Sequence, residues 1–153
     1  MKLLYMLEDD HDRIRRFQAI VSRRHPHAEI RNSRTAPQFI AAWQCRTATP
    51  DLICLDHDLF TDSPTEPDPG DGRDVSQFLV SQPAVCPALI HSTNAIAADS
   101  MLYAMRDAGW TVRRLLPIGD DWIEADWYPL AKDIVDQNSN QQRIASPKHR
   151  SDG

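Results

Sequence analysis

Short apolar runs alternate with amphipathic stretches along most of the chain, and this alternation constrains the fold more than any other feature. The runs LLYML and LICL end abruptly at the acidic residues Glu8 and Asp56. Runs of this length bounded by polar residues are typical of buried strands, and apolar residues spaced three or four apart are typical of helices. Strand followed by helix, repeated five times, predicts an α/β fold with a doubly wound, five-stranded parallel sheet between two helical layers.

The domain organisation follows from length and local composition. The 153 residues are enough for one domain with a hydrophobic core. From Gln137 onward the chain is mostly Asn, Gln, Ser, Lys and Arg, so we expect a domain over 1–136 and a disordered tail over 137–153. Three prolines and two glycines predict a long loop over 60–72, and the segment DDWIEADW, residues 120–127, is expected to be irregular.

Composition excludes several classes of protein. The net charge of −5 gives no general attraction to nucleic acid, and three scattered cysteines without a CxxC pair favour neither a disulfide framework nor a structural zinc site. No apolar run approaches the roughly 18 residues of a membrane span, and the run Leu3–Leu7 is shorter than a signal peptide requires. We expect a cytoplasmic protein without membrane attachment, while the sequence indicates nothing about its oligomeric state.

Polar side chains follow three of the expected strands, at the point where each strand ends. In open parallel sheets, ligands bind at the carboxyl ends of the strands, so these side chains are expected to meet. They are Glu8 and Asp9 after the first strand, Asp56, His57 and Asp58 after the third, and His91, Ser92, Thr93 and Asn94 after the fourth.

The acids Glu8, Asp9 and Asp56 form the first candidate site. Three carboxylates at one edge repel one another unless a cation or a proton lies between them. Ligands that offer only oxygen suit Mg²⁺, which often bridges to a substrate phosphate. The competing interpretation is that some of these acids only cap a turn or helix, and we favour that capping role for Asp10 and Asp12.

His57 and His91 form the second candidate site, because both follow apolar runs on strands expected to be neighbours. Histidine is suited to acid/base work near neutral pH, and two histidines facing one phosphate would divide the roles of general acid and general base. Against this, a single histidine at a strand end is more often a hydrogen-bonded structural group.

Candidate phosphate ligands flank these groups. Ser92, Thr93 and Asn94 offer hydroxyl and amide donors to phosphate oxygens, but they are equally suited to beginning a loop and capping a helix. Arg13, on the first expected helix near the acidic edge, is placed to bind phosphate bidentately.

Five segments together resemble the receiver domains of response regulators. They are LLYMLEDD, DLICLDHDL, GDGRDVSQFL, ALIHSTN and VRRLLP, and the resemblance covers residues 2–136. It implies a receiver-like, flavodoxin-like sheet. It also implies that Glu8 and Asp9 match the acidic pair that binds Mg²⁺, that Asp56 matches the phosphoacceptor, and that Ser92 matches the hydroxyl position, or Thr93 with a shift of one residue.

The sequence departs from ordinary receivers after the fifth strand. Leu116 precedes Pro117 where receivers carry a lysine, and His57 and His91 are additional. This pattern is similar to a divergent branch, the cyclic-phosphate processing receiver domains, whose LDHDL and HSTN segments look like those here. That resemblance implies action on cyclic phosphates of nucleotides or RNA ends.

Three functions remain open from the sequence. The first is a metal-dependent phosphoesterase, with Mg²⁺ on the three acids and a phosphate-containing small molecule or RNA end as substrate. The second is a stand-alone receiver, phosphorylated on Asp56 by a histidine kinase. The third is a binding module without chemistry. The sequence does not decide whether Asp56 is a nucleophile, a metal ligand or a phosphoacceptor.

Overall fold

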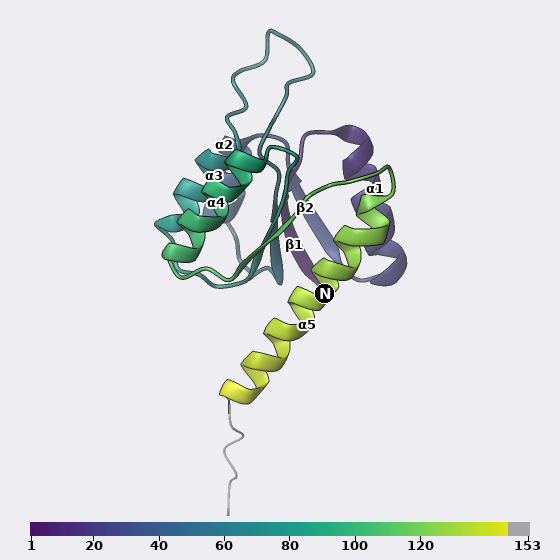
Figure 1. Ribbon diagram of the computed structural model, residues 1–153, viewed down its shortest axis with the longest axis vertical. Coiled ribbons are helices and arrows are strands. Elements are labelled where there is room, and N and C mark those ends of the chain that lie inside the picture. Colours follow the sequence, from purple (N-terminus) through teal and green to yellow (C-terminus); the bar gives the residue numbers. More distant parts are fainter. Residues whose placement is uncertain (147–153) are drawn as a thin grey trace, which may run out of the picture.

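The computed structural model describes residues 1–146 and shows a five-stranded parallel sheet in the order β2-β1-β3-β4-β5 (Figure 1). The strands are β1 (Leu3–Leu7), β2 (Glu29–Ser33), β3 (Leu52–Leu55), β4 (Ala88–His91) and β5 (Val112–Leu115). The helices are α1 (His11–Arg24), α2 (Ala36–Gln44), α3 (Gly72–Val80), α4 (Ala95–Asp107), the π-helix η1 (Ile123–Trp127) and α5 (Tyr128–Ala145).

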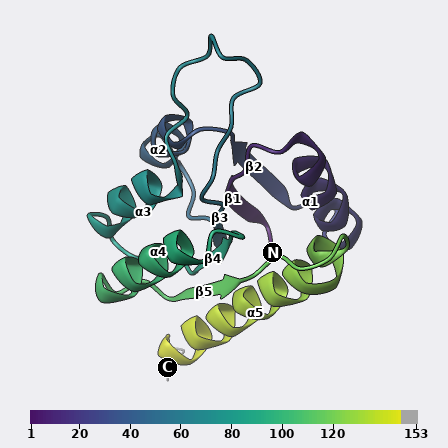
Figure 2. The ribbon, with the colours of Figure 1, turned by 45° about the horizontal axis from the view of Figure 1, so that its top comes forward.

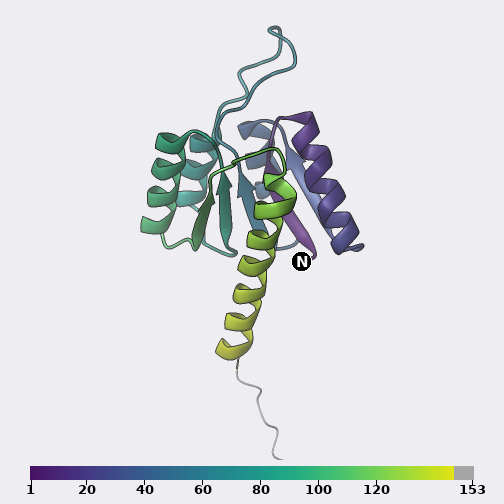
Figure 3. The same cartoon turned by 45° about the vertical axis from the view of Figure 1, so that its right-hand side comes forward.

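Helices cover both faces of the sheet, which confirms the predicted doubly wound fold. Helices α2, α3 and α4 lie on one face and α1 and α5 on the other, so the sheet is the middle of three layers (Figures 2 and 3). Alternate residues of the strands supply the two cores: Tyr5 and Ile53 pack under α2–α4, whereas Met6 and Cys54 pack under α1 and α5. β3 is the central strand and is completely buried.

Side-chain caps fix where the helices begin at the carboxyl edge of the sheet. Asp10 accepts a hydrogen bond from the backbone N–H of Arg13 at 2.9 Å, as the sequence predicts for Asp10. Thr35, Asp71 and Asn94 cap α2, α3 and α4 in the same way. These caps satisfy N–H groups that the first turn of a helix leaves unpaired, and they fix the segments around the candidate site.

The predictions for the C-terminal part are wrong in two places. Residues 123–127, expected to be irregular, form the π-helix η1, which continues directly into α5 and buries Ile123 and Trp127 completely. Residues 137–145, expected to be disordered, continue α5 as an exposed polar helix. The rest of the predicted tail, residues 147–153, lies outside the described residues. No helix within residues 1–146 is both long enough and apolar enough to cross a membrane.

The segment between β3 and α3 is a long loop, as predicted, and it projects away from the carboxyl edge of the sheet (Figure 1). Gly72, the first residue of α3, closes this loop, because its N–H donates to the backbone oxygen of His57 at 2.9 Å. The loop therefore starts and ends beside the end of β3, where Asp56 lies.

Candidate functional site

The pleat of the strands directs the polar residues at their ends to opposite faces of the sheet. Side chains alternate between the two faces along a strand, so residues two apart share a face. Met6, Cys54 and Leu89 lie in the core under α1 and α5. The residues two positions later, which are Glu8, Asp56 and His91, therefore point to this same face. Asp9 and His57 come one residue later, and His57 lies towards the helices of the other face, next to the caps of α3 and α4.

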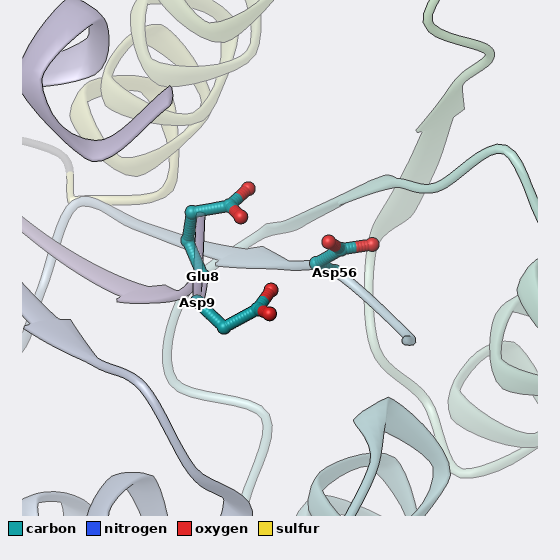
Figure 4. Close-up of side chains that lie close together, drawn as sticks. All are labelled: Glu8, Asp9 and Asp56. Atoms are coloured by element: carbon teal, nitrogen blue, oxygen red, sulfur yellow. The ribbon is translucent and has the colours of Figure 1, made fainter. Parts of the chain in front are cut away.

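Three acidic side chains meet at this edge, as the sequence predicts (Figure 4). Glu8, Asp9 and Asp56 each offer one carboxylate oxygen, and these oxygens lie within 4.8 Å of one another. All three residues are buried, and within residues 1–146 Oδ1 of Asp9 has no hydrogen-bond partner. Three buried oxygen donors with an unpartnered oxygen among them fit a hard divalent cation such as Mg²⁺.

The side chain of Arg13 inserts into this acidic cluster from the first turn of α1. Its Nη2 lies 2.9 Å from Glu8 Oε1, 3.1 Å from Asp56 Oδ2 and 3.9 Å from Asp9 Oδ1. The sequence predicts that this arginine binds phosphate, but in the structure the guanidinium contacts the carboxylates. Arg13 therefore supplies the positive charge that the buried acids need.

Burial dominates the electrostatics of the cluster. It raises the pKa of Asp56 from 3.8 to about 6, with Glu8 raising it further and His91 and Arg13 opposing the rise. Burial also raises the pKa of Asp9, against the hydrogen bond from the N–H of Phe60. The burial of Arg13 would lower its pKa, but the neighbouring carboxylates outweigh this and raise it.

His91 lies beneath the cluster and not at its surface. Its side chain has no exposed area, and its Nε2 is 3.2 Å from Glu8 Oε2. The ring packs between Phe17 and Trp122, with ring centroids at 5.2 and 5.9 Å. Because a carboxylate only accepts, Nε2 carries the proton, and His91 fixes the orientation of Glu8.

His57 lies in a separate group of polar residues. Its Nδ1 is 2.8 Å from Asp58 Oδ1, and its Nε2 is 3.6 Å from Asp71 Oδ2 with no hydrogen-bond partner. His57 and His91 share no partner and lie on opposite faces of the sheet. Within residues 1–146 no hydrogen bond joins the two imidazoles, and the His91 side chain has no exposed surface with which to meet a phosphate, as the expected acid/base pair requires.

The residues after β4 are divided between local structure and solvent. Ser92 is buried, and its Oγ accepts from the N–H of Asn94 at 3.1 Å. Asn94 caps α4, and its Nδ2 lies 3.4 Å from Asp58 Oδ1. Thr93 is exposed. For Asn94 the structure thus shows the capping role, while the hydroxyls of Ser92 and Thr93 keep the capacity to donate to a phosphate.

A contact between the long loop and the rim of the site is not visible in the sequence. The two Nη atoms of Arg34 each lie 2.8 Å from one oxygen of Asp62, and His11 Nε2 lies 3.0 Å from Asp62 Oδ2. We call this contact the loop latch. Next to it is a hollow of about 480 Å³ that also borders Asp9 and Phe60. The only sequence signal was the long loop after a strand end.

The loop latch makes a prediction for Asp62→Asn. The substitution removes the charge that Arg34 and His11 share, so we expect amide hydrogen exchange over residues 60–70 to become roughly two- to fivefold faster, as for loss of an exposed ion pair. Exchange followed by mass spectrometry measures this. Glu66→Gln, in the same loop, removes the same charge without touching the latch. Equal acceleration in both variants would show that charge alone matters.

The end of β5 supplies no cation to the cluster. Leu116 follows β5 and is half exposed, while Arg114 pairs with Asp99 on α4. Among the described residues, the positive charge on the acids comes from Arg13 on the opposite side of the sheet edge.

Comparison with known families agrees with this arrangement. The profile of the family described as cyclic-phosphate processing receiver domain matches residues 4–107. The chain belongs to this family. The matched region of this receiver domain contains all the candidate site residues from Glu8 to Asn94, but it ends before β5. No curated protein matches the chain significantly.

Solved structures of receiver domains share the fold. A CheY-like response regulator receiver domain from Methanospirillum hungatei JF-1 is 15% identical, with a TM-score of 0.67 over 92% of this chain and 98% of the other. The Mn²⁺-bound form of response regulator Rcp1 is 20% identical, with a TM-score of 0.58 over 91% and 93%. The phosphorylated cyanobacterial phytochrome response regulator RcpA is also 20% identical, with a TM-score of 0.58 over 90% and 91%. At these identities, the likeness shows the receiver fold alone.

Proposed function

We propose that this receiver domain is a metal-dependent phosphoesterase that opens cyclic phosphates of nucleotides or RNA ends. The observation that carries the proposal is the buried cluster of Glu8, Asp9 and Asp56, with one unpartnered oxygen, at the ligand-binding edge of the sheet. Membership of the cyclic-phosphate processing family supports the choice of substrate. The Mn²⁺-bound form of response regulator Rcp1, which has the same fold, supports the choice of a divalent cation.

Glu8, Asp9 and Asp56 would hold Mg²⁺ through their carboxylate oxygens. When bound, the cation polarises the phosphoryl group and stabilises charge that develops on its oxygens. In the reaction, the oxygen of a water molecule bonds to phosphorus and one ring P–O bond breaks. The proton of the water ends on the departing ribose oxygen, and the product is a phosphate monoester.

We assign the proton transfer to His57 and not to a pair of histidines. Asp58 Oδ1 lies 2.8 Å from Nδ1 of the ring and favours a proton there, while Nε2 has no hydrogen-bond partner among residues 1–146 and lies 3.6 Å from Asp71 Oδ2. An imidazole fixed in one tautomer by a carboxylate is a suitable general base. The ring is nine-tenths covered, so its access to a phosphate requires the segment that follows β3 to move.

His91 acts in this proposal by positioning Glu8. It has no exposed surface, and its contact at 3.2 Å holds the Glu8 carboxylate towards the cluster. Ser92 and Thr93 would donate their hydroxyl protons to phosphate oxygens. Asn94 would keep the end of β4 in place through its cap on α4.

Phosphotransfer to Asp56 is the second candidate function. Its support is the position of Asp56 at the end of β3 in a receiver fold that also occurs in the phosphorylated regulator RcpA. In this case the partner would be a histidine kinase. The side chain at position 116 counts against it, because Leu116 cannot form the ion pair with an acyl phosphate that a lysine forms.

The test compares two activities of the purified full-length protein. One assay measures hydrolysis of two substrates, 2′,3′-cyclic AMP and an RNA oligonucleotide that ends in a 2′,3′-cyclic phosphate. Each substrate is assayed once in the presence of Mg²⁺ and once in the presence of EDTA. The other measures labelling by radioactive acetyl phosphate. We expect conversion of the cyclic phosphate to a monoester only with Mg²⁺, and a rate about a hundredfold lower in His57→Gln. His27→Gln, at an exposed histidine, is the control.

The possible results separate the two functions. Metal-dependent opening that is lost in His57→Gln and retained in His27→Gln supports the phosphoesterase. A stable phosphoryl group on Asp56 without any opening of cyclic phosphate supports phosphotransfer instead. Absence of both activities would contradict both functions.

A further inference from the structure

The position of Arg13 has a consequence for how the acidic cluster binds a metal. We propose that the Arg13 guanidinium and a divalent cation are alternative occupants of the acidic cluster, so that the cation displaces Arg13 and frees it to bind phosphate. The proposal rests on the proposed metal-dependent function, and it concerns the regulation of that same site.

The two cations compete for the same carboxylates. Nη2 of Arg13 lies within 3.1 Å of oxygens of Glu8 and Asp56, the residues that also contribute to the candidate metal site. Mg²⁺ binds oxygen at about 2.0–2.1 Å. A guanidinium nitrogen and a metal ion that contact the same oxygens are only a few ångström apart, inside a buried region where repulsion between positive charges is poorly screened.

The charges favour replacement of Arg13 by a divalent cation. One guanidinium faces three buried carboxylates, so the cluster stays negative with Arg13 in place. The electrostatic attraction between these carboxylates and a divalent cation is stronger than their attraction to a guanidinium with a single charge. Asp9 Oδ1, which is 3.9 Å from Nη2 and has no hydrogen-bond partner, is an oxygen that the guanidinium does not satisfy.

The contacts of Arg13 allow its side chain to leave the carboxylates. In the part of the chain that the structure describes, its ion pairs with the carboxylates involve one nitrogen, Nη2, and Nε has no hydrogen-bond partner. Arg34, in contrast, holds Asp62 through both of its Nη atoms at 2.8 Å. The Arg13 side chain is 28% exposed, so an outward rotation meets solvent and not the core.

A released Arg13 stays beside the metal. It belongs to the first turn of α1, which the Asp10 cap fixes in place, so only the side chain has to rotate. Its guanidinium then offers paired donors that match the oxygens of a phosphate held by the metal. Metal binding thereby creates the phosphate-binding group, and without metal the same group is engaged with the carboxylates.

The test uses Arg13→Met, which keeps the length of the side chain but removes its charge. Arg15→Met is the control, because Arg15 is a mostly exposed arginine of the same helix turn that pairs with Asp12. Binding of Mn²⁺ to the full-length proteins is measured by electron paramagnetic resonance. Binding of inorganic phosphate to the Mn²⁺-loaded proteins is measured by calorimetry. Far-ultraviolet circular dichroism checks that each variant is folded.

We expect two changes of opposite direction in Arg13→Met. The dissociation constant for Mn²⁺ falls about tenfold, because the competing cation is gone, whereas the dissociation constant for phosphate rises about tenfold. Arg15→Met changes neither value. Arg13→Lys retains a charge and is expected to bind Mn²⁺ with an affinity between those of wild type and Arg13→Met.

Other outcomes overturn the proposal in distinguishable ways. If Arg13→Met binds Mn²⁺ as the wild type does, or more weakly, the two cations do not compete and this inference is wrong, while a metal-dependent function stands. If neither protein binds Mn²⁺, the metal site itself is wrong, and the proposed function falls together with the inference.

Discussion

Asp56→Asn is expected to abolish the proposed metal-dependent turnover and at the same time to make the protein more stable. The carboxylate is one of the three in the cluster, and loss of several kcal/mol of transition-state stabilisation lowers the rate about a thousandfold or more. The same carboxylate is buried, with a pKa raised to about 6, so its ionised form destabilises the fold at neutral pH. Asparagine has the same shape and carries no charge to bury.

The sign of the stability change depends on pH. The pKa of Asp56 is about 6 in the folded protein against 3.8 in the unfolded chain. The penalty of its charge is therefore fully present above pH 6, fades as the pH falls through 6, and is absent below 3.8. The difference between these pKa values corresponds to about 3 kcal/mol at pH 7.5, so the variant should gain up to about that amount.

Urea unfolding of wild type and variant from pH 4 to 8, without added metal, measures this difference. The gain of Asp56→Asn should be largest near pH 8 and should shrink towards pH 4. Asp107→Asn removes the same charge from the exposed end of α4 and should give no such trend. A variant that is less stable than wild type at pH 7.5 would show that Asp56 stabilises the fold through Arg13.

Gly72→Ala is expected to give the largest loss of stability. A Cβ at this position would lie 2.2 Å from the backbone oxygen of Asp56 and 2.8 Å from Cα of His57. Backbone atoms directly after the central strand cannot rotate away as a side chain does, so α3 has to separate from the end of β3. We expect a loss of about 3 kcal/mol or more in the free energy of unfolding, together with weaker binding of a divalent cation if the proposed metal site is correct.

Gly109→Ala distinguishes this clash from ordinary backbone strain. Gly109 has a φ of +89°, but a Cβ there meets no atom within 4 Å. Its substitution should therefore cost only about 1 kcal/mol, from the left-handed conformation alone. Equal losses in the two variants, measured by urea unfolding, would mean that the close approach of α3 and β3 is unimportant.

The fold and the meeting of the acids follow from the sequence because they depend on local patterns. Alternating strands and helices specify a parallel sheet, and in such a sheet Glu8, Asp9 and Asp56 have to reach one edge. The helix caps Asp10 and Thr35 are equally local. The pattern of apolar residues does not predict the C-terminal helices. Polar residues after Gln137 continue α5, and a π-helix forms where an irregular segment was expected.

The differences between the expected and the observed contacts at the site have another physical cause. Arg13 can pair with either of two kinds of anion, a phosphate or the acids of its own chain. The spacing of these residues along the sequence does not indicate which of the two it contacts. His91 looks like a surface group until Phe17 and Trp122 are placed over it. The pair Arg34–Asp62 joins a half-buried arginine to an exposed aspartate, and the sequence contains many other charged residues that could pair with either one.

The long loop is divided into a fixed stem and a free tip. Phe60 donates its N–H to Asp9 at 2.7 Å, Asp62 is held by the latch, and Pro69 accepts from the N–H of Ala36 at 2.8 Å. Residues 63–68 lie between the last two of these anchors, Asp62 and Pro69. Insertions or deletions in this tip would change the reach of the loop over a bound molecule without shifting the carboxylates. If the proposed function holds, the size of the accepted substrate is therefore a property that evolution or engineering can adjust in this tip while the carboxylates stay in place.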